Sequence, residues 1–322
     1  MQYGHVHGID KPISRLVQGC VRARLTTEDS DFALFDAVWD LGCNTFDTAA
    51  SYGAGESEHV LGRWVAKRGV REKAVIVTKG AHPSAERHRV TPADITADVH
   101  DSLARLETDA IDLYLLHRDD PGVPVGPIVE VLTEHARAGR IRAFGGSNWT
   151  HERLREANEY ARAHGLVPFA VGSSNFCLAE RVNEPWAGCV SISGPKGGDA
   201  VEWYTKEHMP LFAWSSLAAG LFSGRFTRDN LDSFDEYLDQ VCVQAYCYED
   251  NFRRLDRAQT LAREKGLTAA QIALAYVFHQ PMDVYALLGC RTGEEFRENL
   301  KAFEINLTPE EIAWLELRSD TP

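Results

Sequence analysis

The chain has 322 residues, with 34 Lys and Arg against 47 Asp and Glu, which gives a formal net charge of −13. This acidic balance excludes a general nucleic-acid binder and a protein that docks on anionic membranes, because both need clustered cations. No apolar run approaches the roughly 20 residues that cross a bilayer. The opening stretch MQYGHVHGIDKPISR also lacks the apolar core of a secretory signal. We therefore expect a cytoplasmic globular protein that forms one domain over residues 1–322; its oligomeric state cannot be read from the sequence.

The seven cysteines are scattered and never spaced as CxxC. This pattern indicates reduced thiols and argues against a disulfide framework or a zinc ribbon. His5 and His7 stand near the N-terminus without a further His or any Cys close by in the sequence. An exposed terminal pair explains them better than metal ligation, so we predict no metal site.

Short apolar runs alternate with helical patterns along almost the whole chain. Each run is too short for a stable helix, and several are dense in Val, Ile, Leu and Phe without alternation, which is typical of a parallel sheet covered on both faces. The predicted strands are Leu16–Cys20, Cys43–Phe46, Ala74–Thr78, Ile111–Leu116, Ile141–Gly145, Phe169–Ser173, Leu211–Trp214 and Val284–Leu288.

Helix signals lie between these runs. Thr91 followed by Pro92 places a capping residue before a proline at the first helical position. The stretch Thr268-Ala-Ala-Gln271 resembles a capping box. Further helices are expected from Thr27 to Leu41, over Val125–Ala138 and over Glu152–Ala163.

Eight strands with intervening helices predict an α/β fold, a closed (β/α)8 barrel. A doubly wound open sheet is the alternative, but no GxGxxG follows any predicted strand and no GxxxxGK[ST] occurs. The rhythm is broken after the seventh strand by Ala218–Asp250, a long polar and aromatic stretch. We expect it to be a long loop that covers a ligand, because long loops in compact domains usually carry function.

Barrel enzymes carry their sites at the C-terminal ends of the strands. Asp47, Lys79 and His117 directly follow the second, third and fourth predicted strands, and Tyr52 lies in the loop after Asp47. A lysine ammonium near a phenol favours the phenolate and lowers the pKa of the tyrosine from its usual ~10. A paired carboxylate would keep the lysine charged, and His117 would orient a carbonyl oxygen. These groups predict a pocket that protonates an oxygen as negative charge develops on it.

At these residues the sequence resembles the aldo-keto reductase family, NAD(P)H-dependent and of bacterial type, and the four groups match its catalytic tetrad. The run FDTAASYGAGESEHVLG over residues 46–62 is similar to the family's F-D-T-A-x-x-Y-G-x-G-x-S-E-x-x-L-G. Residues 115–119, 145–148 and 214–220 resemble three further family motifs, in order along the chain. The resemblance implies reversible, stereospecific reduction of an aldehyde or ketone to the alcohol, with Tyr52 as general acid.

The resemblance also implies NADPH as the preferred cofactor, with NADH as the second option, extended across the barrel mouth without a Rossmann fold. By position, Ser147 and Asn148 would hold the nicotinamide carboxamide and Trp214 would stack on the ring. Ser215 and Leu217 would bind the pyrophosphate.

The segment from Gly289 to Asn299 would hold the adenosine end, with Arg291 and Thr292 as candidates for the 2′-phosphate. A helix cap is an equal interpretation of Thr292, and a solvated side chain is the alternative for Arg291. Glu295 stands where many relatives have Arg or Gln; it would repel a 2′-phosphate but accept from adenine or ribose. At the nicotinamide end, Ser173 stands where relatives often place Gln. Its shorter hydroxyl would hold the carboxamide more weakly.

The loops after the first, third and fourth strands would frame the mouth for a small-molecule carbonyl substrate. Arg22, His82 and Arg118 are the candidates to bind a polar, sugar-like or anionic one. Solvated loop arginines are the alternative interpretation. The cations of these loops are Arg22, Arg24, His82, Arg87, His88, Arg89 and Arg118.

Two other functions stay open. A non-catalytic NADP(H)-binding, redox-sensing subunit would bind the cofactor and reduce no aldehyde. A barrel aldolase would instead use Lys79 to form a Schiff base.

Overall fold

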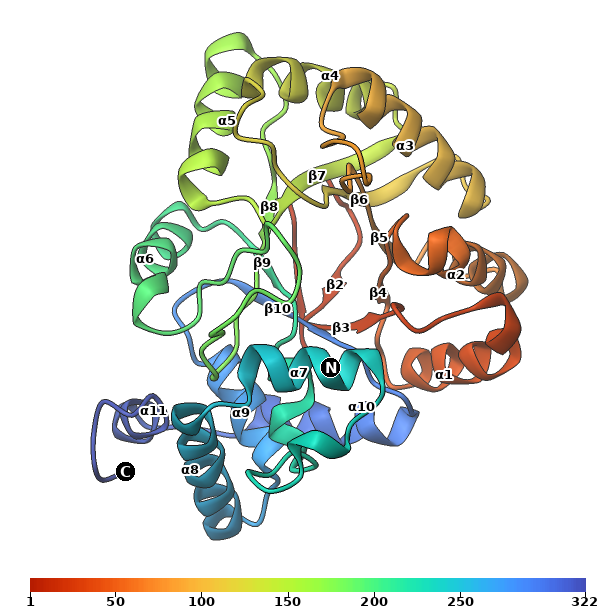
Figure 1. Ribbon diagram of the computed structural model, residues 1–322. Helices are drawn as coiled ribbons and strands as arrows, with labels where there is room; N and C mark the ends of the chain where they lie inside the picture. Colours follow the sequence, from red (N-terminus) through yellow and green to blue (C-terminus); the bar gives the residue numbers. More distant parts are fainter.

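The strands form a closed parallel barrel in the computed structural model, which describes residues 1–322. The eight strands β3 to β10 are neighbours in chain order, and β10 pairs with β3 to close the ring. Figure 1 shows the strands at the centre and the helices around them. The predicted (β/α)8 barrel is therefore confirmed, and the open-sheet alternative is wrong.

Each of the predicted strands is present, with small shifts at the ends. β5, β6 and β10 are buried along their whole length, as expected for strands covered on both faces. The barrel strands are β3 (Leu16–Gly19), β4 (Thr45–Asp47), β5 (Val75–Gly80), β6 (Ile111–Leu116), β7 (Ile141–Ser147), β8 (Val171–Ser173), β9 (Leu211–Ala213) and β10 (Val284–Leu288).

The helices begin where their caps predict. Thr91 accepts a hydrogen bond from the backbone N–H of Asp94, and Thr268 and Gln271 form the complete capping box. None of the helices combines the length and the hydropathy of a membrane-spanning segment. The helices are α1 (Glu28–Asp40), α2 (Glu56–Arg68), α3 (Pro92–Arg105), α4 (Val125–Arg137), α5 (His151–His164), α6 (Gly198–Glu207), α7 (Tyr237–Tyr246), α8 (Glu249–Lys265), α9 (Ala269–Phe278), α10 (Gly293–Leu300) and α11 (Pro309–Leu315).

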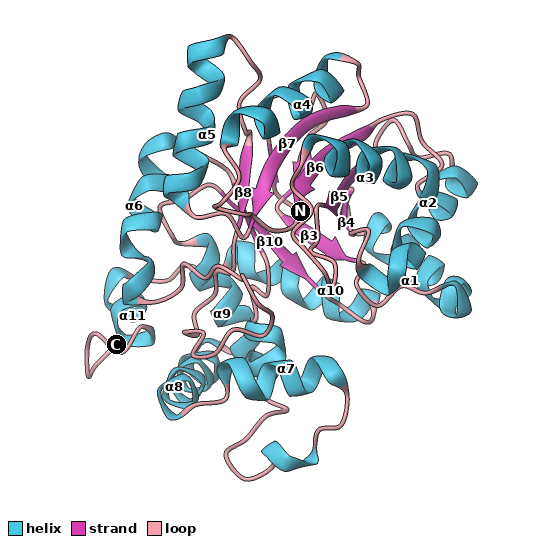
Figure 2. Cartoon of the chain, turned by 45° about the horizontal axis from the view of Figure 1, so that its top comes forward, coloured by secondary structure: helices cyan, strands magenta, loops and turns pink.

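The segment after the seventh barrel strand is not the plain loop we expected. It contains 3-10 turns over Ala218–Ser223 and the helix α7, which lies with α8 at one side of the barrel (Figure 2). The apolar face of α7 is short: Val241, Cys242, Ala245 and Tyr246 are buried. A single stripe of this length is hard to distinguish from loop in a polar, aromatic stretch.

The barrel interior has its own hydrophobic core, separate from the larger core between strands and helices. The chain before the barrel adds a hairpin that the sequence did not indicate, β1 (Tyr3–Gly4) paired with β2 (Ile13–Ser14). Val6, Ile9 and Ile13 of this N-terminal segment join the interior core. The hairpin thus packs against the interior of the barrel from the N-terminal ends of the strands, which leaves the opposite end for ligands.

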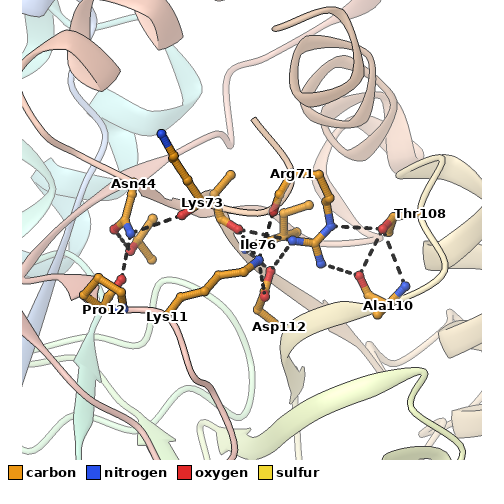
Figure 3. A network of polar contacts seen from close by, with 11 residues as sticks. Lys11, Pro12, Asn44, Arg71, Lys73, Ile76, Thr108, Ala110 and Asp112 are labelled. Carbon is orange, nitrogen blue, oxygen red and sulfur yellow. Dashed lines mark hydrogen bonds and ion pairs between the residues drawn. The ribbon is translucent and has the colours of Figure 1, made fainter. Parts of the chain in front are cut away.

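A buried ionic network fixes this N-terminal segment to the barrel (Figure 3). The carboxylate of Asp112 on β6 is 2% exposed and accepts from Lys11 Nζ at 2.7 Å and from Arg71 at 2.8 Å. It also accepts from the backbone N–H of Ile76 at 2.9 Å. Lys11 Nζ additionally donates to the carbonyl oxygens of Arg71 and Ala74. One carboxylate therefore joins the N-terminal segment, the β5 backbone and β6.

Asp112→Asn should destabilise the fold by about 3 kcal/mol, because it leaves two cations without their buried partner. Urea unfolding measures this loss. Asp109→Asn is the matched control, since Asp109 is exposed and makes no ion pair, and it should change stability by less than about 0.5 kcal/mol. Equal midpoints for the two variants would contradict the structural role of the network.

Candidate active site

Four polar side chains meet at the C-terminal end of the barrel. Asp47 ends β4, Lys79 lies in β5 and His117 follows β6, so neighbouring parallel strands deliver them to one edge. Tyr52 begins the 3-10 turn after β4. Lys79 Nζ lies 2.7 and 2.8 Å from the two carboxylate oxygens of Asp47 and 3.3 Å from the hydroxyl of Tyr52. The fourth contact of this ammonium is the Thr48 carbonyl oxygen, at 2.9 Å.

The turn that presents Tyr52 depends on a glycine. Gly53 has a φ of +57°, and a Cβ there would come within 2.9 Å of the Arg24 guanidinium. Any other residue would therefore strain the backbone and displace the arginine. Gly53 therefore allows the turn that follows Tyr52 and leaves space for Arg24.

Lys79 remains cationic in spite of its burial. Burial alone would lower its pKa, but the attraction of Asp47 and Tyr52 is larger in sum and raises the pKa above the usual value. Lys79 is therefore charged at neutral pH.

From the sequence we expected the net pKa of Tyr52 to fall, and that expectation is wrong. Burial raises the pKa of the phenol by more than Lys79 lowers it, and Asp47 adds to the rise. The charge of Lys79 is largely balanced by Asp47 at 2.7 Å, so it cannot outweigh desolvation. Tyr52 is consequently a protonated donor at neutral pH, which suits a general acid.

His117 is held neutral. Burial, then the charges of Lys79 and Arg118, bring the pKa of its imidazole well below the usual ~6.5. Its Nδ1 lies 3.3 Å from the Ser51 hydroxyl. When Ser51 donates to Nδ1, the ring proton is on Nε2, where it can be donated to a carbonyl oxygen.

A cavity of about 1330 Å³ extends from these four residues toward the N-terminus of α10. This exceeds the roughly 300–1,000 Å³ typical of ligand pockets. Its wall includes Arg22, His82 and Arg118, the candidate substrate residues. The candidate cofactor residues on the wall are Ser147, Asn148, Trp214, Ser215, Leu217, Gly289, Arg291, Thr292, Glu295 and Asn299.

The strand ends around Ser147 and Asn148 are tightly organised. Asn148 donates from Nδ2 to the His117 carbonyl and to Ser147 Oγ, both at 3.2 Å, and its Oδ1 accepts from the Val190 N–H. Ser173 is fully buried and does not reach the cavity wall. Its carbonyl accepts from the Asn148 N–H at 2.8 Å, while its hydroxyl has no partner.

Positive φ angles mark the exits of alternate strands. Ala81 after β5, Asn148 after β7 and Ser215 after β9 have φ of 56°, 60° and 52°. L-residues pay roughly 1–2 kcal/mol each for this region, and such strain concentrates at functional sites.

The other end of the cavity is built around α10. Thr292 caps this helix by accepting from the Glu295 N–H at 3.1 Å, and Glu295 accepts from the Arg291 N–H at 2.6 Å. Thr292 therefore caps α10, which is one of the two interpretations that the sequence allowed. Arg291 pairs with Glu236 at 3.0 Å, and Glu236 also pairs with Arg22 at 3.3 Å. One carboxylate of the 218–250 segment thus binds two arginines of the cavity wall.

The cavity fits an extended dinucleotide in its size and in its donors. The indole Nε1 of Trp214, a residue of the cavity wall, is buried without a hydrogen-bond partner. The hydroxyl hydrogens of Ser147 and Thr292 remain available, because both oxygens act as acceptors within the protein.

The residues on the wall that were not identified from the sequence include Ser51, Trp186 and Cys189. Trp186 and Cys189 come from the long connection between β8 and α6, and Trp186 Nε1 donates to the Tyr237 hydroxyl of α7 at 2.6 Å. The tryptophan in this long connection was the available signal.

Comparison with known proteins shows the family of this chain. The aldo/keto reductase family model matches residues 19–317. The uncharacterized oxidoreductase YrpG of Bacillus subtilis is 29% identical over 98% of this chain and 95% of its own length. Norsolorinic acid reductase stcV of Emericella nidulans is 30% identical, over 90% of this chain and 72% of its own.

The "Probable aryl-alcohol dehydrogenase AAD4" of Saccharomyces cerevisiae is 27% identical over 90% of this chain and 87% of its own length. A thermostable aldo-keto reductase, crystallised with the inhibitor epalrestat, has the same fold, with a TM-score of 0.74 and 23% identity over 99% of this chain and 100% of that one. Since the relatives come from a bacterium and from fungi, a bacterial type is not established. The chain belongs to the aldo-keto reductase family and is an oxidoreductase that acts on carbonyl and alcohol groups.

Proposed function

We propose that the protein reduces a polar, sugar-like aldehyde or ketone to the alcohol with NADPH, reversibly, with Tyr52 as general acid. The contact that carries this proposal is the 3.3 Å approach of Lys79 Nζ to the Tyr52 hydroxyl. Because the ammonium donates to the phenol oxygen, the phenol hydrogen is left to be donated to a substrate.

The chain's own residues would divide the work as follows. The dinucleotide, when bound, supplies the hydride that attacks the carbonyl carbon. Tyr52 donates its proton to the carbonyl oxygen as charge develops there, and Lys79 stabilises the phenolate that remains. Asp47 keeps Lys79 charged and in place. Neutral His117 holds the carbonyl oxygen by a hydrogen bond.

The competing functions are less well supported. A Schiff base requires a neutral amine, whereas Asp47 and Tyr52 keep the pKa of Lys79 high. A redox-sensing subunit would need the cofactor groove but no proton donor, whereas this chain has Tyr52 together with Lys79 and Asp47.

The cofactor contacts follow the cavity from one end to the other. Ser147 and Asn148 would hold the carboxamide and Trp214 the nicotinamide ring. Ser215 and Leu217 would hold the pyrophosphate. Ser173 would act from behind this wall, by fixing Asn148 through its carbonyl oxygen.

NADPH is favoured over NADH because Arg291 is an arginine on the wall at the adenosine end, next to the capped N-terminus of α10. The carboxylate of Glu295 accepts a hydrogen bond from the Arg291 N–H, and this contact partly compensates the negative charge of Glu295. Gly289 and Asn299 complete this end.

We also propose that the protein works in the cytoplasm. All seven cysteines are buried and free, as expected in a compartment that keeps thiols reduced.

Tyr52→Phe should lower kcat for aldehyde reduction by at least ~10²-fold, since general-acid catalysis contributes about that much or more. NADPH binding, measured by fluorescence titration, should hardly change because the lost interaction acts in the transition state. Tyr3→Phe is the matched control at the opposite end of the barrel, where the Tyr3 hydroxyl donates to the Gly42 carbonyl. Full turnover by the Tyr52 variant would refute the assignment. No turnover by wild type on any aldehyde, with tight NADPH binding, would favour the redox-sensing subunit.

The pH profile of kcat/KM for reduction should be level from about pH 6 to 9. His117 has a pKa well below the usual ~6.5, and burial raises the pKa of Tyr52 above ~10, so neither titrates in this window. The rate should fall only at higher pH, where Tyr52 loses its proton. An inflection near pH 6.5 would show that His117 titrates in the working enzyme.

Arg291→Ala should raise KM for NADPH about tenfold, the loss of one charge-assisted hydrogen bond to a phosphate. KM for NADH should change far less. Arg297→Ala is the control, because Arg297 is an exposed arginine of α10 that lies outside the cavity wall. An equal rise of KM for NADPH and for NADH would show that Arg291 does not bind the 2′-phosphate.

A further inference from the structure

We propose that the substrate carries a carboxylate and that Arg118 binds it, so that the enzyme acts on carbonyl acids. This rests on the proposed function and names the polar group of its substrate.

Arg118 is a buried cation without a counterion. It is 5% exposed, lies on the cavity wall and makes no ion pair with any carboxylate of the chain. Its partners are neutral: the Ala187 carbonyl at 3.1 Å, the His117 carbonyl at 2.8 Å and the Cys189 sulfur at 3.2 Å. A guanidinium has five N–H donors, so two of them have no acceptor within the protein. An uncompensated buried charge is costly, and a bound anion would remove that cost.

The carboxylates closest to Arg118 in the sequence make no ion pair with it. Asp119 pairs with Arg153 at 3.0 Å, and Asp120 accepts from the backbone N–H of Gly122. The structure thus directs neighbouring acids away from Arg118.

The other strong cations of the cavity contrast with it. Arg22 and Arg291 share Glu236, and Arg225 pairs with Asp239. Lys79 pairs with Asp47. Only Arg24 resembles Arg118, because it donates to the Val21 and Ala23 carbonyls and to no acid. Arg87 and Arg89, by contrast, pair with Asp94 and lie outside the cavity wall.

The position of the guanidinium suits a substrate anchor. Its hydrogen bond to the His117 carbonyl fixes it beside the imidazole that would hold the reacting oxygen. An anion on Arg118 would therefore orient the carbonyl group of the same molecule toward Tyr52. His82, whose ring centroid lies 5.0 Å from that of His117, lies on the same part of the wall.

A carboxylate fits better than a phosphate. Arg118 is one fully buried charge, which a monoanion balances, and its planar fork matches two coplanar oxygens. A phosphate dianion would need a second buried cation, and Arg24 is only partly buried. Of the glutamates on the cavity wall, Glu294, Glu295 and Glu298 belong to α10. The fourth, Glu236, is paired with Arg22 and Arg291 and not with Arg118. The cavity thus attracts anions at its substrate end, in a protein of net charge −13.

The test compares aldehydes that differ only in the anion: 4-carboxybenzaldehyde with its neutral amide 4-formylbenzamide, and succinic semialdehyde with butanal. The wild type should favour the acid of each pair by at least tenfold in kcat/KM. Arg118→Met should bring this ratio close to one, and Arg118→Lys should restore part of it. Arg89→Met should leave the ratio unchanged, since Arg89 pairs with acids outside the cavity.

A binding measurement keeps the test independent of turnover. Benzoate should quench the tryptophan fluorescence of the wild type at concentrations at which benzamide does not, and at least tenfold more benzoate should be needed for Arg118→Met. Equal binding of benzoate and benzamide to the wild type would overturn the proposal.

The outcomes separate this inference from the proposed function. Reduction of the neutral aldehydes without preference for the acids would overturn the carboxylate anchor and leave carbonyl reduction standing. Failure to reduce any aldehyde would reject both. A larger preference for glyceraldehyde 3-phosphate over glyceraldehyde than for acid over amide would assign Arg118 to a phosphate and overturn the carboxylate.

Discussion

The ion pair between Lys79 and Asp47 is the interaction on which the rest of the site depends. Both side chains are almost fully buried, at 3% and 5% exposed, and the ammonium contacts both carboxylate oxygens. Removing either partner would leave an unpaired charge in a dry environment, which proteins tolerate poorly. The pair therefore fixes the phenol of Tyr52 at one distance from a permanent cation. Burial in turn keeps that phenol protonated.

The barrel divides stability and chemistry between its two ends. At the N-terminal end, the hairpin and Asp112 with its two cations join the strands into a closed base. At the C-terminal end, polar residues at and after the ends of the strands line the cavity. Asp112 at one end and Asp47 at the other are both buried and paired with cations, but the cation of Asp47 also contacts the hydroxyl of Tyr52. This division is typical of barrel enzymes.

Much of this arrangement was predictable from the sequence, because it depends on local patterns. Apolar runs of four to six residues gave the strands, and polar residues at their ends gave Asp47, Lys79 and His117. The two-residue strands of the base hairpin carry no periodicity to detect. The pairing of Arg22 with Glu236, and the absence of any acid beside Arg118, depend on residues far apart in the chain. The direction of the pKa shift of Tyr52 required knowing how deeply it is buried.

The left-handed residues at the exits of β5, β7 and β9 have a consequence for how such a mouth changes over evolutionary time. The backbone conformation of Ala81, Asn148 and Ser215 sets the direction in which the chain leaves the barrel. Side chains on the loops beyond them can be exchanged without moving the frame that supports the reacting groups. A new preference among ligands would then arise through a few loop substitutions, while a β-branched residue at one of these three exits would alter the frame itself.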